Sequence, residues 1–313
     1  MRSPVLFLTY KRFRTAEPVF EAIRQAKPPR LYFASNAPNP ANEGEDQLVQ
    51  KVRNLLKLVD WPCEVYTLFH EKYFAVKYSI PTAIDWFFEH EEEGIILEDD
   101  VLPHPDFFMF CETLLHRYAE DHRVWMITGD NFQDGQKRGS GSYYFSRYTH
   151  IWGWATWRRA WKHYDIDISY WKEWNKSDAW RQLWSDNVER HYWEKIFNRM
   201  FDHGIDTWDY QWTASAWYHG GLTATPNVNL VSNIGFGEDA THTTSASSSH
   251  AEIPVQSLGE LMHPAKIEQD KNADRYAFNH AFGGRTQRFP WVLVSFPKCV
   301  VGYLYRRLKQ SFR

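Results

Sequence analysis

Short apolar runs alternate with amphipathic segments through the first third of the chain. The apolar runs predict strands at residues 4–9, 31–35, 63–68 and 94–98. The segments between them have the apolar spacing of helices, at residues 17–26, 45–58 and 78–89. This alternation is typical of an α/β fold, in which helices cover both faces of the sheet and ligands gather at the carboxyl ends of the strands. We therefore expect the functional site to follow Thr9, Ser35 and Leu97.

The second half of the chain is less regular. It predicts a strand at 124–127, a hairpin arm at 142–146, helices near 158–164 and over 178–202 and 209–219, and extended chain at 222–232 that Pro226 interrupts. Residues 241–250 are rich in Ser and Thr and indicate a loop at the edge of the domain. We expect one elaborated domain over residues 1–245, a polar connection over 246–288 and a basic aromatic tail over 289–313.

The net charge and the cysteines indicate which kinds of partner the protein binds and in which cellular compartment it functions. A formal net charge of −3 with 24% charged residues indicates no nucleic-acid partner. The three cysteines, Cys63, Cys111 and Cys299, have no metal or redox spacing, which favours reduced thiols in a cytoplasmic protein. The apolar run at 4–9 is too short for a signal peptide or a membrane span, so we interpret it as a buried strand.

The tail combines aromatic residues with a basic end. From Phe289 onward apolar and aromatic residues alternate, and the chain finishes near Arg306-Arg307-Leu308-Lys309. This pattern fits peripheral contact with the anionic inner face of a membrane, and it fits a C-terminal helix packed on the domain equally well.

Aromatic residues are unusually frequent, at 17% of the chain with 16 tryptophans. Indole rings fill cores and also stack on the apolar faces of sugars. Because core packing accounts for most aromatic runs at helical spacing, the abundance alone identifies no carbohydrate site.

Three consecutive acids, Glu98-Asp99-Asp100, follow the apolar run that begins at Gly94. Adjacent carboxylates repel, so a position at the end of a buried strand is unfavourable unless solvent or a cation relieves them. Proteins hold Mg²⁺ or Mn²⁺ with one or two carboxylates while phosphates of the substrate fill other positions. The pattern favours a divalent-cation site, and the alternative is a solvated acidic turn before the next helix.

Four stretches in the same order resemble a known family. They are residues 95–108 around the acids, Tyr10-Lys11-Arg12, Trp152-Gly153-Trp154-Ala155-Thr156-Trp157, and Trp208-Asp209-Tyr210-Gln211-Trp212 ahead of Thr225-Pro226. Together they look like N-acetylglucosaminyltransferase type I and related bacterial nucleotide-diphospho-sugar transferases. The resemblance covers roughly residues 4 to 243 and implies the GT-A fold, a mixed central sheet flanked by helices.

The resemblance also implies residue roles at the donor. Asp100 would bind the metal, and Glu98 and Asp99 would contact the donor's ribose and sugar. Arg12 would contact the nucleotide, as would Asn36, which stands where the family has an acid and so weakens the case for uracil. In the family the Trp-Gly-Trp stretch shapes the sugar and acceptor pocket, which makes Trp154 a candidate donor contact, although a packing contact permitted by the glycine explains the same residues.

The catalytic base is expected in the Trp-Asp stretch. Asp209 stands at the start of the helix predicted at 209–219, where an ordinary N-cap role is the alternative, and Asp206 is the second candidate base. Beyond Gly235 and Gly237, His242 lies where many GT-A enzymes place a late metal ligand, although a solvated loop histidine is the simpler interpretation.

These observations predict a glycosyltransferase. It would move a hexosyl or N-acetylhexosaminyl group from a nucleotide-diphosphate donor, UDP-GlcNAc-like in the resemblance, to a hydroxyl of a carbohydrate or lipid-linked glycan, with inversion and a divalent cation. A nucleotidyltransferase is the enzymatic rival, but no Gly- and Lys-rich phosphate loop follows the first strand. A non-catalytic carbohydrate-binding protein would explain the tryptophans and leave the acidic triplet unexplained.

Overall fold

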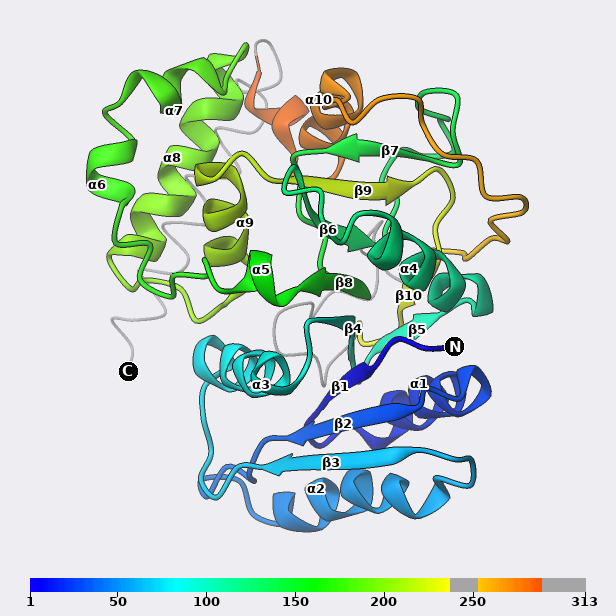
Figure 1. The fold of residues 1–313 in the computed structure, drawn as a ribbon. Helices are drawn as coiled ribbons and strands as arrows, with labels where there is room; N and C mark the ends of the chain where they lie inside the picture. The colour runs from blue at the N-terminus through cyan, green and yellow to red at the C-terminus, as the bar shows by residue number, and fades with distance from the viewer. Residues whose placement is uncertain (237–252, 289–313) are drawn as a thin grey trace.

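The computed structural model describes residues 1–236 and 253–288. They form a central mixed sheet and the helices that flank it (Figure 1). Its eight strands lie in the order β3-β2-β1-β4-β8-β6-β9-β7. The parallel half contains β1 (Val5–Thr9), β2 (Arg30–Ser35), β3 (Glu64–Phe69) and β4 (Glu93–Glu98). The other half contains β6 (Val124–Thr128), β7 (Tyr143–Ser146), β8 (Trp154–Trp157) and β9 (Leu222–Pro226), where β8 runs antiparallel to β4 and β6. The predicted fold class, a mixed α/β sheet flanked by helices, is confirmed.

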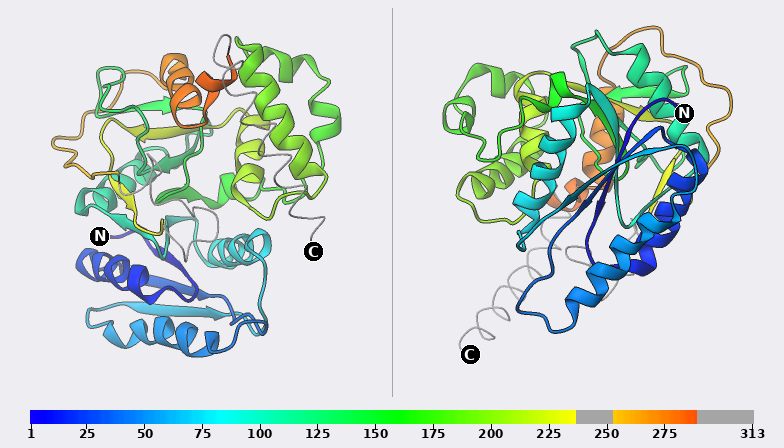
Figure 2. Two further views of the ribbon diagram at one scale, coloured as in Figure 1. Left: turned by 180° about the vertical axis from the view of Figure 1, so that it is seen from behind. Right: turned by 60° about the horizontal axis from the view of Figure 1, so that its bottom comes forward.

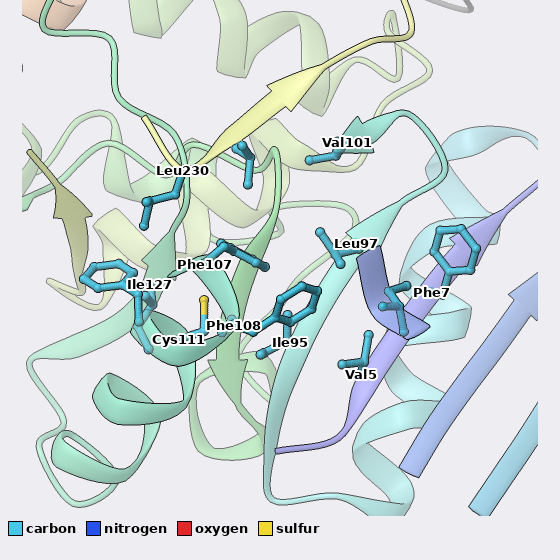
Figure 3. Packing of buried hydrophobic residues seen from close by; sticks show 14 of the residues in the cluster. Val5, Phe7, Ile95, Leu97, Val101, Phe107, Phe108, Cys111, Ile127 and Leu230 are labelled. Atoms are coloured by element: carbon cyan, nitrogen blue, oxygen red, sulfur yellow. The ribbon is translucent and has the colours of Figure 1, made fainter. Parts of the chain in front are cut away.

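Alternation along the strands sends side chains into two cores. In β1, Val5 and Phe7 face one core while Leu6 and Leu8 face the other, because successive side chains of a strand point to opposite faces. The first core is covered by α1 (Phe13–Ala26), α2 (Glu45–Arg53), the 3₁₀ turn η1 (Asn54–Leu58) and α4 (Pro105–Arg117). Figure 3 shows Phe107 and Phe108 of α4 beside Ile95 of β4.

The second core is richer in aromatic residues. It is covered by α3 (Val76–His90), α5 (Arg158–Trp161), α6 (Trp171–Trp174), α7 (Asp178–Gln182), α8 (Asn187–Phe201) and α9 (Asp209–Tyr218). In the right-hand view of Figure 2, α1 and α2 lie on one side of the strands and α3 with the green helices on the other. Most of the tryptophans between 152 and 217 pack here, which agrees with the core interpretation of their abundance.

The helix expected over 178–202 is divided into two. Between α7 and α8 the carboxylate of Asp186 accepts the Val188 N–H at 2.9 Å and caps α8, so a new helix begins there.

A short two-stranded sheet stands beside the carboxyl end of β4. It pairs β5 (Val101–Pro103) with β10 (Val231–Asn233) in antiparallel register, with Asn233 opposite Val101. The Ile234 N–H then donates to the Asp100 carbonyl at 2.8 Å. This pairing brings the chain after residue 233 onto the acidic triplet.

Residues 253–288, expected as part of a polar connection, pack on the sheet. The helix α10 (Lys271–His280), followed by the 3₁₀ turn η2 (Gly284–Gln287), buries Phe278 in the second core. The Asp270 N–H donates to the Phe145 carbonyl of β7 at 2.7 Å, which fixes the start of α10 against the edge strand.

The expected domain boundary at residue 245 and the tail at 289–313 lie outside the described residues. Among the helices of residues 1–236 and 253–288, none combines the length and apolar character that crossing a bilayer requires.

Candidate functional site

The carboxyl ends of β1, β2 and β4 meet at one edge of the sheet. Strand register places Thr9 beside Ser35 and Leu8 beside Glu98. The residues that follow these strands, Tyr10 to Arg12, Asn36 and the acidic triplet, are therefore neighbours, as the sequence predicted.

Arg12 is the cation of this edge, and it stands at the N-cap of α1. Its Nη2 lies 2.7 Å from Asp99 Oδ1 and 2.9 Å from Asp100 Oδ2. Burial lowers the pKa of Arg12, but the two carboxylates outweigh that effect and raise it overall. The guanidinium thus offsets part of the negative charge of the triplet.

Asp99 is almost completely buried, at 3% exposure. Its Oδ2 accepts the Tyr10 N–H at 3.0 Å while Oδ1 binds Arg12. Burial raises the pKa of Asp99, and the neighbouring Arg12 opposes that rise. Asp99 thereby joins the β1–α1 loop to the end of β4.

Glu98 is partly exposed, and its pKa lies far above the usual value of a glutamate. Burial first, then the charges of Asp100 and Asp99, raise its pKa to about 8, with a further contribution from Asp209. Asp209 is far from Glu98 in sequence, and its charge is the smallest of these contributions.

Asp100 lies under the chain that leaves β10. A Cβ added at Gly235 would come within 2.6 Å of the Asp100 Cβ and 2.7 Å of its Cγ, so only glycine fits there. The ring of Phe236 then meets Trp152 edge-on, with centroids 5.8 Å apart. Residues 233–236 thus cover one side of Asp100, and the predicted ligand His242 lies outside the described residues.

The acids fit a cation only if other groups complete its coordination. Within the described residues, no group of three or more His, Cys, Asp or Glu side chains is arranged to hold a metal ion. Asp100 offers carboxylate oxygens, one of which lies 2.9 Å from Arg12 Nη2. A hard cation there would take most of its oxygens from phosphate and water, and the Mg²⁺ or Mn²⁺ site stays a prediction.

Asn36 joins two strand ends. Its Nδ2 donates to the Phe74 carbonyl at 2.8 Å, and its Oδ1 accepts the N–H groups of Ala37 and Phe74. Nearby, Arg53 donates to Ser35 Oγ at 3.0 Å and to the Asn36 carbonyl at 3.1 Å, without an acidic partner among the described residues. The nucleotide contact of Asn36 stays a prediction, and Arg53 is a cation at this edge that the sequence did not single out.

Trp154 lies in the core rather than on an open wall. Its side chain is fully buried, and its ring stacks on Trp208 with centroids 5.7 Å apart and packs on Trp161 and Trp212. A donor contact by Trp154 would require the ring to leave this cluster. Trp152 is the indole of the Trp-Gly-Trp stretch that borders a cavity.

Asp209 and Asp206 have different environments. The N-cap of α9 is Trp208, and no side chain caps it, so Asp209 does not have the N-cap role; its carboxylate accepts the Thr207 hydroxyl. Asp206 is exposed and accepts the Lys77 N–H at 2.9 Å, which fixes it to the first turn of α3. Asp209 borders the cavity, whereas Asp206 is not among the described residues that line it.

This cavity has a volume of about 170 Å³ and contains an acid that sequence analysis missed. Asp130 follows β6, is 2% exposed and lines the cavity with Asp209. The available signal was the pattern of an apolar run at 124–127 followed shortly by an acid, the same pattern that identified Glu98 to Asp100.

No protein-family model matches the chain, and no curated protein matches it in sequence. Among solved structures, the chain is similar to the inositol-1-phosphate CTP transferase from T. maritima, with a TM-score of 0.36 and 11% identity over 72% of this chain and 85% of that one. It is similar to a UDP-glucose pyrophosphorylase complexed with UDP-glucose, with a TM-score of 0.31 and 9% identity over 52% of this chain and 78% of that one.

A glycosyltransferase, GlyE from Streptococcus pneumoniae TIGR4, is also similar, with a TM-score of 0.33 and 9% identity over 72% of this chain and 45% of that one. The chain therefore matches less than half of the GlyE chain. At these TM-scores and identities we base no residue role on the likeness, and the resemblance to N-acetylglucosaminyltransferase type I stays a prediction.

Proposed function

We propose that this protein is a glycosyltransferase that moves a sugar from a nucleotide-diphosphate donor to a hydroxyl acceptor, with inversion at the anomeric carbon. The observation that carries the proposal is the position of Asp209. This carboxylate acts electrostatically on Glu98 of the acidic edge and also lines the adjoining cavity. We therefore assign this acid to the junction between a donor at the sheet edge and an acceptor in the cavity.

The donor side is formed by Arg12 and the acidic triplet. Arg12, on the loop after β1, lies 2.7 Å from Asp99, which follows β4, and the nucleotide of a donor would lie at this carboxyl edge of the sheet. Glu98 is the partly exposed acid of the three and is assigned to the hydroxyls of the donor sugar.

A divalent cation, Mn²⁺ or Mg²⁺, would be held by Asp100 and would offset charge on the diphosphate. The remaining ligands would come from phosphate and water, with His242 a further candidate.

The acceptor side performs the proton transfer. The acceptor oxygen attacks the anomeric carbon and forms the new glycosidic bond, while the bond from that carbon to the diphosphate oxygen breaks. The acceptor proton passes to Asp209, and the nucleoside diphosphate leaves with the electron pair of the broken bond.

The proposal is tested with a panel of UDP-, GDP-, ADP- and CMP-sugars, each with MnCl₂ or EDTA, and a mixture of p-nitrophenyl glycosides as acceptors. We expect one donor class to release its nucleotide faster with metal and with one acceptor class, and mass spectrometry to show a new glycoside. Release of pyrophosphate from a nucleoside triphosphate and a sugar phosphate would instead identify a nucleotidyltransferase. Sugar binding without turnover would identify a carbohydrate-binding protein.

A further inference from the structure

The cavity beside Asp209 has the composition of a sugar subsite. Its described lining combines the aromatic rings of Phe132, Trp152 and Phe282 with polar groups from Asp130, Asp209 and Thr213. A saccharide ring has apolar faces that pack on aromatic rings and a rim of hydroxyls that requires polar partners. The cavity is small, at about 170 Å³, so we assign it a single saccharide ring.

Asp130 is the polar group of this cavity with unused bonding capacity. Its Oδ2 accepts the Trp152 N–H at 2.9 Å, and this is the one hydrogen bond that the described residues give its carboxyl group. A carboxyl group has about four lone-pair sites. Because the carboxyl group lines the cavity and is bonded only through Oδ2, its other oxygen is available there to a ligand hydroxyl or to water.

We propose that Asp130 determines acceptor specificity: its carboxyl group hydrogen-bonds one hydroxyl of a single acceptor saccharide ring held in the cavity beside Asp209. This inference rests on the glycosyl transfer proposed above. The cavity is assigned to the acceptor because it contains Asp209, which must reach the acceptor hydroxyl, whereas Arg12 and Asp99 are not among its described lining residues.

The protonation state of Asp130 decides the direction of the bond. Burial raises the pKa of Asp130 well above its usual value, and the Trp152 N–H opposes this only in part. Burial therefore favours the neutral form of the carboxyl group. Its carbonyl oxygen accepts from Trp152 and its O–H donates to the sugar, a pattern that an asparagine side chain reproduces.

A purely structural role makes a different prediction. If Asp130 only held the Trp152 loop, its substitution would change stability and leave acceptor kinetics alone. Asp130→Asn keeps both the acceptor for Trp152 and a donor for the sugar, whereas Asp130→Leu has the same branched shape, is larger, and keeps neither. Asp274→Asn is the matched control, because Asp274 is also 2% exposed with a raised pKa but is bonded to Ser146 and Gln269, outside the described lining of the cavity.

The test uses the full chain with the donor and the p-nitrophenyl glycoside selected by the panel above. We expect Asp130→Asn and Asp274→Asn to keep kcat/KM for the acceptor within about threefold of the unsubstituted protein. Asp130→Leu should lose about 10- to 100-fold, the size expected when one hydrogen bond to a substrate hydroxyl is removed. Donor affinity, measured by calorimetry, should be equal in all four proteins.

Three results would overturn the inference. Acceptor kinetics of Asp130→Leu within threefold would give Asp130 a structural role only. An equal loss in Asp130→Asn would contradict the neutral donor, and weaker donor affinity in either variant would assign the cavity to the donor. If Asp130→Leu does not melt cooperatively, Asp130→Ala replaces it, because it leaves room for water on the Trp152 N–H. An unsubstituted protein that neither binds nor turns over any nucleotide sugar would instead refute the proposed function, and this inference with it.

Discussion

At the scale of single residues, the site contains three neighbouring carboxyl groups, and the positive charge of the Arg12 guanidinium offsets part of their negative charge. Arg12 contacts both Asp99 and Asp100, so the positive charge is shared, and Glu98 is left with a pKa of about 8. Burial first, and then the neighbouring carboxylates, raise this pKa, and strongly perturbed pKa values are typical of functional sites.

Asp209 and Asp206 can be separated by one pair of variants. Asp209→Asn keeps the size of the side chain and removes the base, so transfer should fall by about 10²- to 10⁴-fold with donor affinity intact. Asp206→Asn retains an oxygen for the Lys77 N–H and should transfer at a rate near that of the unsubstituted protein. Initial rates with saturating donor measure both.

An inactive Asp206→Asn beside an active Asp209→Asn would move the base to Asp206. If both variants remain active, no base lies in this segment.

Individual residues were predictable where the local pattern carries the chemistry. The acids 98–100 stand out because they end an apolar run, and Arg12 follows the first strand directly. Asp130 and Arg53 were missed because their significance depends on a cavity and on neighbours distant in sequence. Trp154 was placed at the donor because sequence does not distinguish an indole inside an aromatic cluster from one on a wall.

At the scale of elements, the pairing of β10 with β5 determines what lies over Asp100. Gly235→Ala should force the Asp100 carboxylate to move, since the added Cβ would collide with it. We expect donor affinity to fall at least about 10-fold and the free energy of unfolding to fall by about 1–3 kcal/mol. Calorimetry and urea unfolding measure the two effects.

Gly204→Ala is the matched glycine control, because its added Cβ meets only the Arg199 carbonyl, at 3.2 Å. In the double variant with Asp100→Asn, Gly235→Ala should add little further loss of donor affinity. Fully additive losses would show that Gly235 does not act through Asp100.

The contact between α10 and β7 contains a pH-dependent group. Burial raises the pKa of Asp274 from 3.8 to about 6, so the folded state holds this proton more tightly than the unfolded chain does. Stability from this group is therefore present below about pH 4 and is lost as the pH rises to about 6. Asp274→Asn should gain stability relative to the unsubstituted protein over this interval, by on the order of 3 kcal/mol.

Urea unfolding at pH 4, 5, 6 and 7 tests this difference. A constant stability difference between the two proteins across that range would contradict the raised pKa of Asp274.

Elements were predictable where a short apolar run stands between polar segments. Strands β1, β2 and β4 were located to within a few residues because they are continuous apolar runs that are buried along most of their length, and β3 and α9 were located equally closely. Strand β8 was missed because Trp154–Trp157 is short, buried on both faces and without alternation. Helix α10 was missed because few of its residues are apolar and its anchor is the bond from Asp270 to Phe145.

At the scale of the whole molecule, the tail at 289–313 remains a prediction. We expect the full chain to sediment with vesicles containing phosphatidylserine and a variant truncated after Arg288 to remain in the supernatant, because the basic residues beyond it supply the attraction. Equal sedimentation of both proteins, or sedimentation that 0.5 M NaCl leaves unchanged, would contradict peripheral attachment through the tail.

The central proposal for the whole molecule is that the carboxyl edge of the sheet binds a nucleotide-diphosphate donor with a cation at Asp100. The measurement that tests it most directly is donor binding by calorimetry, with MnCl₂ or EDTA, to the unsubstituted protein and to Asp100→Asn. Asp60→Asn is the control, because Asp60 is an exposed acid paired with Arg24 away from the triplet. We expect Mn²⁺ to strengthen donor binding at least about 10-fold in the unsubstituted protein and in Asp60→Asn, and to have no effect in a folded Asp100→Asn, which lacks the charge that a hard cation requires. Equal donor affinity and equal Mn²⁺ dependence in all three proteins would contradict the claim.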